Sequence, residues 1–507
     1  MTSTFDHNYD RNDELLDQNT DSAPLLSHQS QPPTSSKNTT LSLPQILALV
    51  CINGGLQVFF STVMANLSPY LHNLGLSKSA AAIIIICLPL SGAFLGPTAG
   101  AFSDSLRTRF GRRRPIILSG AVLTVAFMML LAWVPQFIEA EAASLALAIL
   151  CTILMAISVQ PVQAGVRALM VDIAPASQQS RASSWAGRIQ GVSAIFSFFA
   201  SSLTLPSLPG LGGLAQMQAL ACLNFITLGS TVAITCVFIH EKDSRRISVA
   251  GEAKRSVADV FRRIFSTVKE LKGKIRQTCL TQFFSWFAWF PFTYYNTTYI
   301  GELGSASMST PSSLLTTPTS SSSLAPLSFA TISFITITLL PTLLPHASRY
   351  LNKPHTSTSD SDLIWLWTCT QPILGLLLAL TLAVSYQYQG IILVAFAGIP
   401  WAVTQWVPFA IVGYETSRLG LVPSAEREDG EDGQRGRDDE EEDSRSGATL
   451  GVHNLAISLP QVLSGLVSSG TYKIAEVAKS EVPTAWVLAS SGVAAFVASW
   501  LAAKMLR

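Results

Sequence analysis

Gly100-Ala-Phe-Ser-Asp104 and Arg107-Thr-Arg-Phe-Gly-Arg-Arg-Arg-Pro115 form one short turn between two long apolar runs of the chain. The turn holds five arginines, and basic residues next to membrane spans are retained on the cytoplasmic side. It therefore predicts two membrane-spanning helices joined at the cytoplasmic face. Taken by themselves, the arginines are explained by membrane topology alone.

The composition indicates that lipid surrounds most of the chain. Only 13% of the 507 residues are charged, against about 25% in soluble domains. The seven cysteines lie in or at the ends of apolar runs, without the spacing of a metal site or a disulfide framework. We expect no metal, no cofactor and no nucleic-acid partner. No cleavable signal peptide is visible, because residues 1–40 are polar and precede the first apolar run.

Apolar runs of about 20 residues predict transmembrane helices. We place twelve, near 43–70, 80–102, 115–135, 143–171, 184–205, 216–239, 278–300, 324–345, 363–385, 390–413, 448–470 and 483–503. The eighth is diluted by serines, threonines and prolines, which helices lining a polar path tolerate. The sequence thus predicts an all-α membrane protein with twelve transmembrane helices.

The charged segments predict the organisation around these spans. We expect a disordered cytoplasmic tail over 1–40, six helices within 41–240, a basic linker over 241–276 and six further helices within 277–507. Basic residues gather on one side of the spans, which places both termini in the cytoplasm. An acidic cytoplasmic loop, 418–447, contains a solvated charge run that we expect to be disordered.

Two of these segments have alternative interpretations. Apolar residues recur at helical spacing in the basic linker, which predicts an interfacial helix that either contacts lipid headgroups or has a regulatory role. Asp21-Ser-Ala-Pro-Leu25-Leu26 has the form of an acidic dileucine sorting signal. We favour the plasma membrane, and this motif leaves a vacuolar or endosomal membrane open.

One arginine falls inside a predicted span. Gln160, Gln163 and Arg167 share one face of the fourth helix, because they are three and four residues apart. An arginine within a membrane span costs at least about 2.5 kcal/mol on insertion scales, so it must face protein, water or a ligand. Either helix-end carbonyls or an acid hold Arg167, or its guanidinium donates to sugar hydroxyls. Asp172 lies about 140° around the helix from Arg167, so the two are not a simple pair.

Several motifs, taken in their order along the chain, resemble the sucrose transporter family in the glycoside-pentoside-hexuronide branch of the major facilitator superfamily. The resemblance is closest to the fungal-type alpha-glucoside and sucrose carriers. The matching stretches, besides the arginine-rich turn, are Gly55-Leu-Gln57, Leu67-Ser-Pro69-Tyr70, Cys87-Leu-Pro-Leu-Ser-Gly92, Gln163-Ala-Gly-Val-Arg167-Ala-Leu-Met-Val-Asp172, Trp289-Phe-Pro-Phe292, Gly398-Ile-Pro-Trp401 and Leu450-Gly-Val-His453-Asn454-Leu-Ala-Ile-Ser-Leu-Pro460-Gln461.

The resemblance implies a proton-driven disaccharide carrier with the major facilitator fold, in which two pseudo-symmetric six-helix halves surround the path. Arg167 matches the arginine that family members use at the substrate site, and Gln57 matches a polar residue lining the path. The superfamily's signature between helices 2 and 3 implies an inner gate. Its residues here are Gly100, Asp104, Arg112, Arg113 and Arg114.

The chain also departs from the family. Ala156 occupies the position at which plant members carry the aspartate that takes up the proton. Lys78 replaces an outer-loop histidine of those members, and Asn296 and Thr298 replace acids near the end of the seventh span. Two residues remain candidates for proton coupling. His453 is either a protonation site or a helix-packing residue, since histidine titrates near neutral pH. Glu302 either titrates or is a solvated loop acid.

Other polar residues converge on the predicted spans from both halves. Asn53, Gln405 and Asn454 either line the substrate site or bond helix to helix. Arg188 either contacts Asp172 in a gate or lies at the membrane interface. We therefore predict a proton-coupled carrier of a sucrose- or maltose-type sugar that works by alternating access. An uncoupled sugar facilitator and a sugar sensor that does not transport are the rival hypotheses, whereas no catalytic spacing suggests an enzyme.

Overall fold

The computed structural model describes residues 40–241, 273–307, 322–350, 360–418 and 432–506, with a few positions between 262 and 271. Its helices are α1 (Leu43–Val50), α2 (Ile52–Asn73), α3 (Lys78–Ile85), α4 (Cys87–Ser105), α5 (Arg114–Phe137), α6 (Glu141–Ile173), α7 (Ala176–Ser202), α8 (Gln216–Phe238), α10 (Gly273–Ser307), α12 (Leu324–Tyr350), α13 (Asp360–Leu380), α14 (Gln387–Phe396), α15 (Gly398–Arg418), α16 (Asp432–Val477) and α17 (Pro483–Ala503). The sorting motif at Asp21, most of the basic linker, the surroundings of Gly100 and the side chain of Asp104 lie outside the described part.

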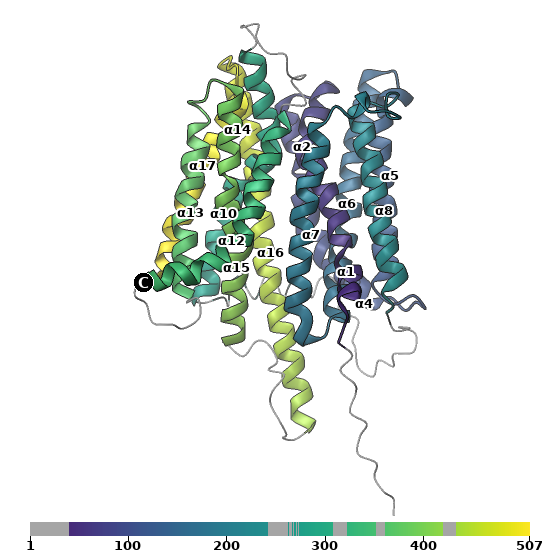
Figure 1. Ribbon diagram of the computed structural model, residues 1–507, viewed down its shortest axis with the longest axis vertical. Helices are drawn as coiled ribbons and strands as arrows, with labels where there is room; N and C mark the ends of the chain where they lie inside the picture. Colours follow the sequence, from purple (N-terminus) through teal and green to yellow (C-terminus); the bar gives the residue numbers. More distant parts are fainter. Residues whose placement is uncertain are drawn as a thin grey trace, which may run out of the picture. The chain divides into compact units, whose positions relative to one another are not determined.

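Each of the twelve predicted spans coincides with one helix or with a pair of helices that follow each other directly. The described residues otherwise contain two short 3-10 helices and no strand, so the all-α prediction is confirmed. The first span is interrupted at Cys51, between α1 and α2, the second at Ile86, between α3 and α4, and the tenth at Ala397, between α14 and α15. Figure 1 shows the long helices running side by side along one direction.

The prediction for the acidic loop is wrong in part. We expected the charge run from Glu426 to Arg445 to be disordered, yet α16 begins at Asp432 and carries the acidic run in helical conformation. No proline interrupts the chain between Pro423 and Pro460, and glutamate and arginine are strong helix formers. The chain therefore continues the membrane helix instead of ending it at the span boundary.

Eight spans are apolar enough to be recognised by hydropathy within the described residues. The other four predicted spans correspond to α7, α10, α12 and α16. These four helices make the contacts between the N-terminal half, α1–α8, and the C-terminal half, α10–α17: α7 packs on α12, α10 on α2, and α16 on α3 and α4. A helix between two protein faces can carry polar residues that a lipid-facing helix cannot, which explains their lower hydropathy.

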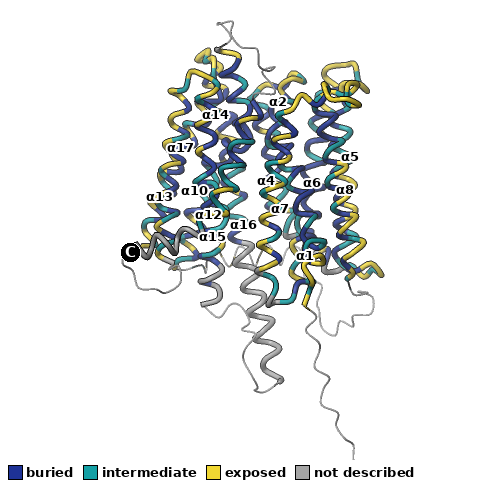
Figure 2. The backbone as a smooth tube through the Cα atoms, in the orientation of Figure 1, coloured by how far each residue is buried: buried dark blue, intermediate teal, exposed yellow. Residues whose placement is uncertain are grey.

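The outer helices carry the apolar surface instead. Exposed side chains include Leu118 and Val122 on α5 and Phe225 and Ile226 on α8. Figure 2 shows exposed positions along α5, α8, α13 and α17, while buried positions gather between the helices. So large an exposed apolar surface is typical of contact with lipid and not with water.

Candidate transport path

Arg167 and Gln163 lie on one face of α6 and have no hydrogen-bond or ion-pair partner among the described residues. The guanidinium of Arg167 and the amide of Gln163 make no hydrogen bond or ion pair with any residue that the structure describes, and Arg167 is exposed. Gln160, by contrast, is buried and donates from Nε2 to Ser91 Oγ on α4, at 3.1 Å. The three residues predicted as one set therefore separate: Gln160 joins α6 to α4, and Gln163 and Arg167 remain available.

The polar residues of α2 face the same surface of α6. Asn53 Nδ2 donates to Val50 O at 3.0 Å and lies 3.5 Å from Met170 Sδ. Met170 is three residues beyond Arg167, so it lies on the arginine's face of the helix. The two helices run in opposite directions, because α2 begins and α6 ends at the arginine-rich end of the bundle. Gln57, one turn beyond Asn53 on α2, is therefore at about the level of Arg167.

Gln57 itself keeps hydrogen-bonding capacity. Its Nε2 donates to Ser61 Oγ on the same helix at 3.1 Å, and its side chain is half-buried. Close packing of α2 against its neighbours holds this residue in place. A Cβ atom on Gly55 would lie 2.8 Å from Leu228 Cα, so only glycine lets α8 approach so closely. The matched stretch Gly55-Leu-Gln57 thus combines a packing residue with a polar one.

The C-terminal half contributes polar groups that lack partners among the described residues. In this part of the chain, Gln405 Nε2 on α15 is buried and makes no hydrogen bond, and Asn454 on α16 is half-buried and makes none either. Gln282 on α10 is fully buried, and both ends of its amide are unpaired with respect to the described residues. The sequence analysis did not select Gln282, although a polar side chain inside the predicted span 278–300 was a visible signal.

His453 occupies a packed position between helices. It is 1% exposed, its ring lies edge-on to Phe409 of α15 at 4.8 Å between centroids, and its Nε2 has no partner within the described part of the chain. Ala156, where plant relatives of the resembled family carry an aspartate, is fully buried. Its carbonyl accepts from Ser91 Oγ at 2.8 Å. Both positions are embedded in helix packing.

Contacts between the halves gather at the end of the bundle that holds Lys78. Thr297 Oγ1 on α10 donates to Ala65 O on α2 at 2.7 Å. Ser79 Oγ, at the start of α3, donates to Ser469 O on α16 at 3.0 Å. An ion pair joins the halves at the same end, with Lys78 Nζ 2.7 Å from Glu302 Oε1. These contacts join the two halves at this end of the bundle.

Glu302 is not the solvated loop acid that the sequence left open. It lies within α10, is 9% exposed and accepts from Thr484 of α17 twice: from the backbone N–H at 3.0 Å and from the hydroxyl at 2.6 Å. α10 extends seven residues past the predicted span end at 300, which carries Glu302 into the interface instead of a loop. A buried carboxylate requires such partners, because an unpaired charge would be costly.

The arginine-rich end is organised differently from the prediction. Arg113, only 7% exposed, pairs through Nε with Asp172 Oδ2 at 2.8 Å. Arg188 does not contact Asp172; its guanidinium lies over the ring of Trp185, 5.0 Å from the centroid. The Arg112 carbonyl accepts from Ser103 Oγ at 3.2 Å. Since Arg113 directly precedes α5 and Asp172 lies in the last turn of α6, the ion pair ties two helices of the N-terminal half together.

Glu241 is a partner that the sequence analysis assigned to the linker. Its carboxylate accepts from the backbone N–H groups of Arg113 and Arg114 at 3.1 and 3.0 Å. These two N–H groups lie at the N-terminus of α5, where unpaired N–H groups and the helix dipole favour a negative charge. Arg114 also donates to the carbonyl of Cys236 near the end of α8. The turn therefore fixes the ends of α5 and α8 relative to each other.

Gly111 makes room for this carboxylate, which yields a prediction. Gly111 has φ +97°, and a Cβ atom there would overlap the side chain of Glu241. Gly75 has φ +95° with nothing within 4 Å of its Cβ position. Gly111→Ala should therefore lower the thermal stability of the purified protein by more than Gly75→Ala. The expected excess is about 1–3 kcal/mol, the typical cost of overpacking. Equal losses in the two variants would mean that the Glu241 contact does not constrain the turn.

Comparisons with known proteins agree with this geometry. A family model described as "MFS/sugar transport protein" matches residues 49–325. A general alpha-glucoside permease of Schizosaccharomyces pombe is 28% identical, with 95% of this chain and 97% of the permease covered. The sucrose transport protein SUC4 of Arabidopsis thaliana is 23% identical over 87% and 88% of the two chains.

Solved structures share the arrangement of the helices. A D-xylose-proton symporter superposes with a TM-score of 0.59 and 15% identity, covering 90% of this chain and 98% of the symporter. The nucleoside transporter NupG gives a TM-score of 0.57, with 13% identity and coverage of 91% of this chain and 99% of NupG. At this identity the likeness concerns the fold, and it confirms the two-half architecture expected from the sequence.

Proposed function

The chain belongs to the MFS/sugar transport family, and on that basis we propose that it carries a disaccharide of the sucrose or maltose type by alternating access with proton symport. It is a multi-pass membrane protein and a sugar transporter, not an enzyme. The names of the alpha-glucoside permease and the sucrose transport protein support an α-glucoside as substrate. The observation that carries the proposal is an intramembrane arginine, Arg167, without a protein partner among the described residues.

The proposed substrate site is centred on Arg167 and Gln163, with Gln57 facing them from α2. A guanidinium presents five donors in a fixed plane, and an amide offers both donors and acceptors, as adjacent sugar hydroxyls require. A free charge within a span is costly unless water or a ligand meets it. Gln405 and Asn454 are proposed to complete the site from the C-terminal half. Asn53, through its contact with Met170, and Gln160, through its hydrogen bond to Ser91, hold the helices around the site together.

The contacts between the halves support a gating scheme. The distribution of basic residues places the Lys78 end outside and the arginine-rich end in the cytoplasm. In this scheme the ion pair of Lys78 with Glu302 and the Ser79–Ser469 contact hold the outer end closed, which supports an inward-facing state. In the outward-facing state we expect these contacts to separate. The cytoplasmic gate would then form around Asp104, with the cluster of Arg113, Asp172 and Glu241 keeping the N-terminal half rigid.

Glu302 is the proposed proton-coupling residue. Its carboxylate bridges the halves, so protonation would weaken the attraction to Lys78 and favour opening of the outer gate. His453 is the weaker candidate, because it packs on Phe409 and has no charged partner among the described residues. Proton coupling then takes place at the interface between the two halves. It does not take place in the fourth span, because Ala156 has no group that can titrate.

Sugar uptake at two pH values tests the proposal. Cells expressing the chain should take up radiolabelled sucrose or maltose faster at external pH 5 than at pH 7.5, and a protonophore should abolish accumulation. Uptake that ignores both pH and protonophore would make the protein an uncoupled facilitator, the alternative that Ala156 favours. Surface expression without uptake of either sugar would contradict the proposed substrate.

A further inference from the structure

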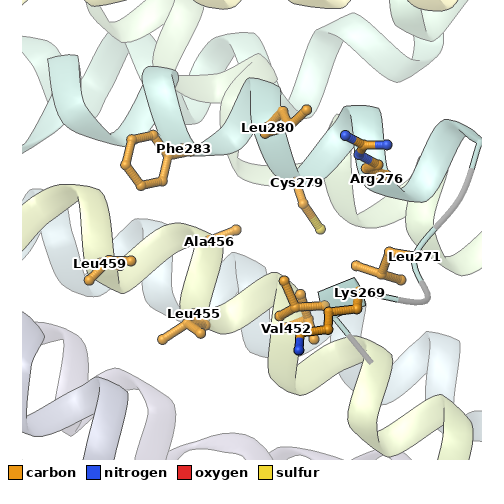
Figure 3. Close-up of a pocket in the computed structure, with 11 residues that line it drawn as sticks. Lys269, Leu271, Arg276, Cys279, Leu280, Phe283, Val452, Leu455, Ala456 and Leu459 are labelled. Carbon is orange, nitrogen blue, oxygen red and sulfur yellow. The ribbon is translucent and has the colours of Figure 1, made fainter. Parts of the chain in front are cut away.

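A pocket of about 560 Å³ lies apart from the proposed sugar path, between the first turns of α10 and the middle of α16. Figure 3 shows its two walls: Cys279, Leu280 and Phe283 on α10, and Leu455, Ala456 and Leu459 on α16. The remaining lining residues are Val268, Lys269, Leu271, Arg276 and Val452. Its lining is apolar apart from two basic residues, and none of the described lining residues is acidic.

The two basic residues lie toward one end of the pocket. Lys269 and Arg276 are exposed, and neither makes an ion pair with a residue in the described part of the chain. The neighbouring Lys274 differs, because its Nζ is 3.4 Å from Glu415 Oε1. Arg276 comes two residues before the predicted start of its span at 278. The charged end of the pocket is therefore at the level of lipid headgroups, where basic residues attract anionic lipids.

The apolar end opens toward the lipid-facing surface. Leu459 begins a row of exposed leucines on α16 that continues with Leu463 and Leu466. Spacings of four and three residues place them on one helix face. From Arg276 to Phe283 the wall extends about 10 Å along α10, against about 15 Å for the hydrocarbon core of one leaflet. A sugar would find almost no hydrogen-bonding group along this wall.

We propose that this pocket binds an anionic phospholipid of the cytoplasmic leaflet. Lys269 and Arg276 contact the phosphate and the acidic headgroup, and the first part of one acyl chain lies in the groove between α10 and α16. The site joins the basic linker to two helices that form the interface between the halves. A bound lipid would hold α10 and α16 together at the cytoplasmic end.

Native mass spectrometry of the purified full-length protein tests this assignment. Phosphatidylserine should bind about thirtyfold more tightly than phosphatidylcholine, the preference expected from two basic side chains at a membrane surface. The double variant Lys269→Gln/Arg276→Gln should lose this preference. The matched control, Arg181→Gln, removes an exposed charge at the arginine-rich end away from the pocket and should keep it.

A second variant tests the groove independently of charge. Ala456→Phe should weaken binding of both lipids, because the phenyl ring would fill the groove between α10 and α16. The preference for phosphatidylserine should remain. Soluble glycerophosphoserine, which has the headgroup without acyl chains, should fail to displace the lipid. Equal binding of the two phospholipids, wild-type behaviour of the double variant, or displacement by glycerophosphoserine would overturn the proposal.

Discussion

Arg167→Ala should reduce sugar uptake by at least about a hundredfold, because two lost hydrogen bonds from a charged donor are together worth several kcal/mol. The guanidinium makes no hydrogen bond or ion pair with the described protein, so its removal breaks none there. The abundance of the variant in the membrane should therefore equal that of the wild type. The measurement is initial uptake of radiolabelled maltose and sucrose, normalised to the amount of transporter at the surface.

Two variants separate a substrate role from a structural one. Arg167→Lys keeps the charge but loses the planar fork of donors, so it should retain a small part of the uptake, mainly through a raised KM. Arg181→Ala, which removes an exposed arginine near the start of α7, should transport normally. Normal uptake by Arg167→Ala would exclude the arginine from the substrate site.

Glu302→Gln should uncouple sugar movement from protons. The amide resembles a protonated carboxyl and leaves Lys78 without its ion-pair partner, while Thr484 can still donate to the amide oxygen. We expect uptake that no longer increases in acid and no longer concentrates the sugar, whereas exchange of labelled for unlabelled sugar continues. The measurement is uptake between pH 5 and pH 7.5 together with exchange at constant pH.

His453→Gln is the matched comparison for this prediction. It removes the other titratable candidate, which lies among packed side chains, and should retain the response to pH. If His453→Gln abolishes the acid stimulation and Glu302→Gln does not, the coupling assignment is wrong. If neither variant changes it, proton coupling lies elsewhere in the chain.

The fold was predictable because hydropathy and charge act locally. The last span was placed at 483–503, where α17 begins and ends. The weakly apolar eighth span is also a helix, α12. It lies at the interface between the halves, so it needs less apolar surface than a helix that faces lipid. The breaks at Cys51, Ile86 and Ala397 were not predicted, because no glycine or proline occupies these positions.

The site was only partly predictable, because its contacts are distant in sequence. Spacing alone placed Gln163 and Arg167 on one helix face, and α6 is helical through both residues. It could not identify Arg113 as the partner of Asp172, 59 residues away, or Thr484 as a partner of Glu302, 182 residues away. Such distinctions depend on which helices pack together, and a single sequence does not encode that in any local pattern.

Counterflow in proteoliposomes tests the central claim most directly, because it requires a carrier and a sugar but no proton gradient. Vesicles containing the purified protein are loaded with unlabelled maltose and diluted into a trace of labelled maltose. We expect transient accumulation of label that Arg167→Ala abolishes, and no accumulation when the vesicles are loaded with a non-glucosidic solute such as mannitol. Absence of counterflow with both maltose and sucrose, by protein that remains folded in the vesicles, would contradict the assignment as an α-glucoside carrier.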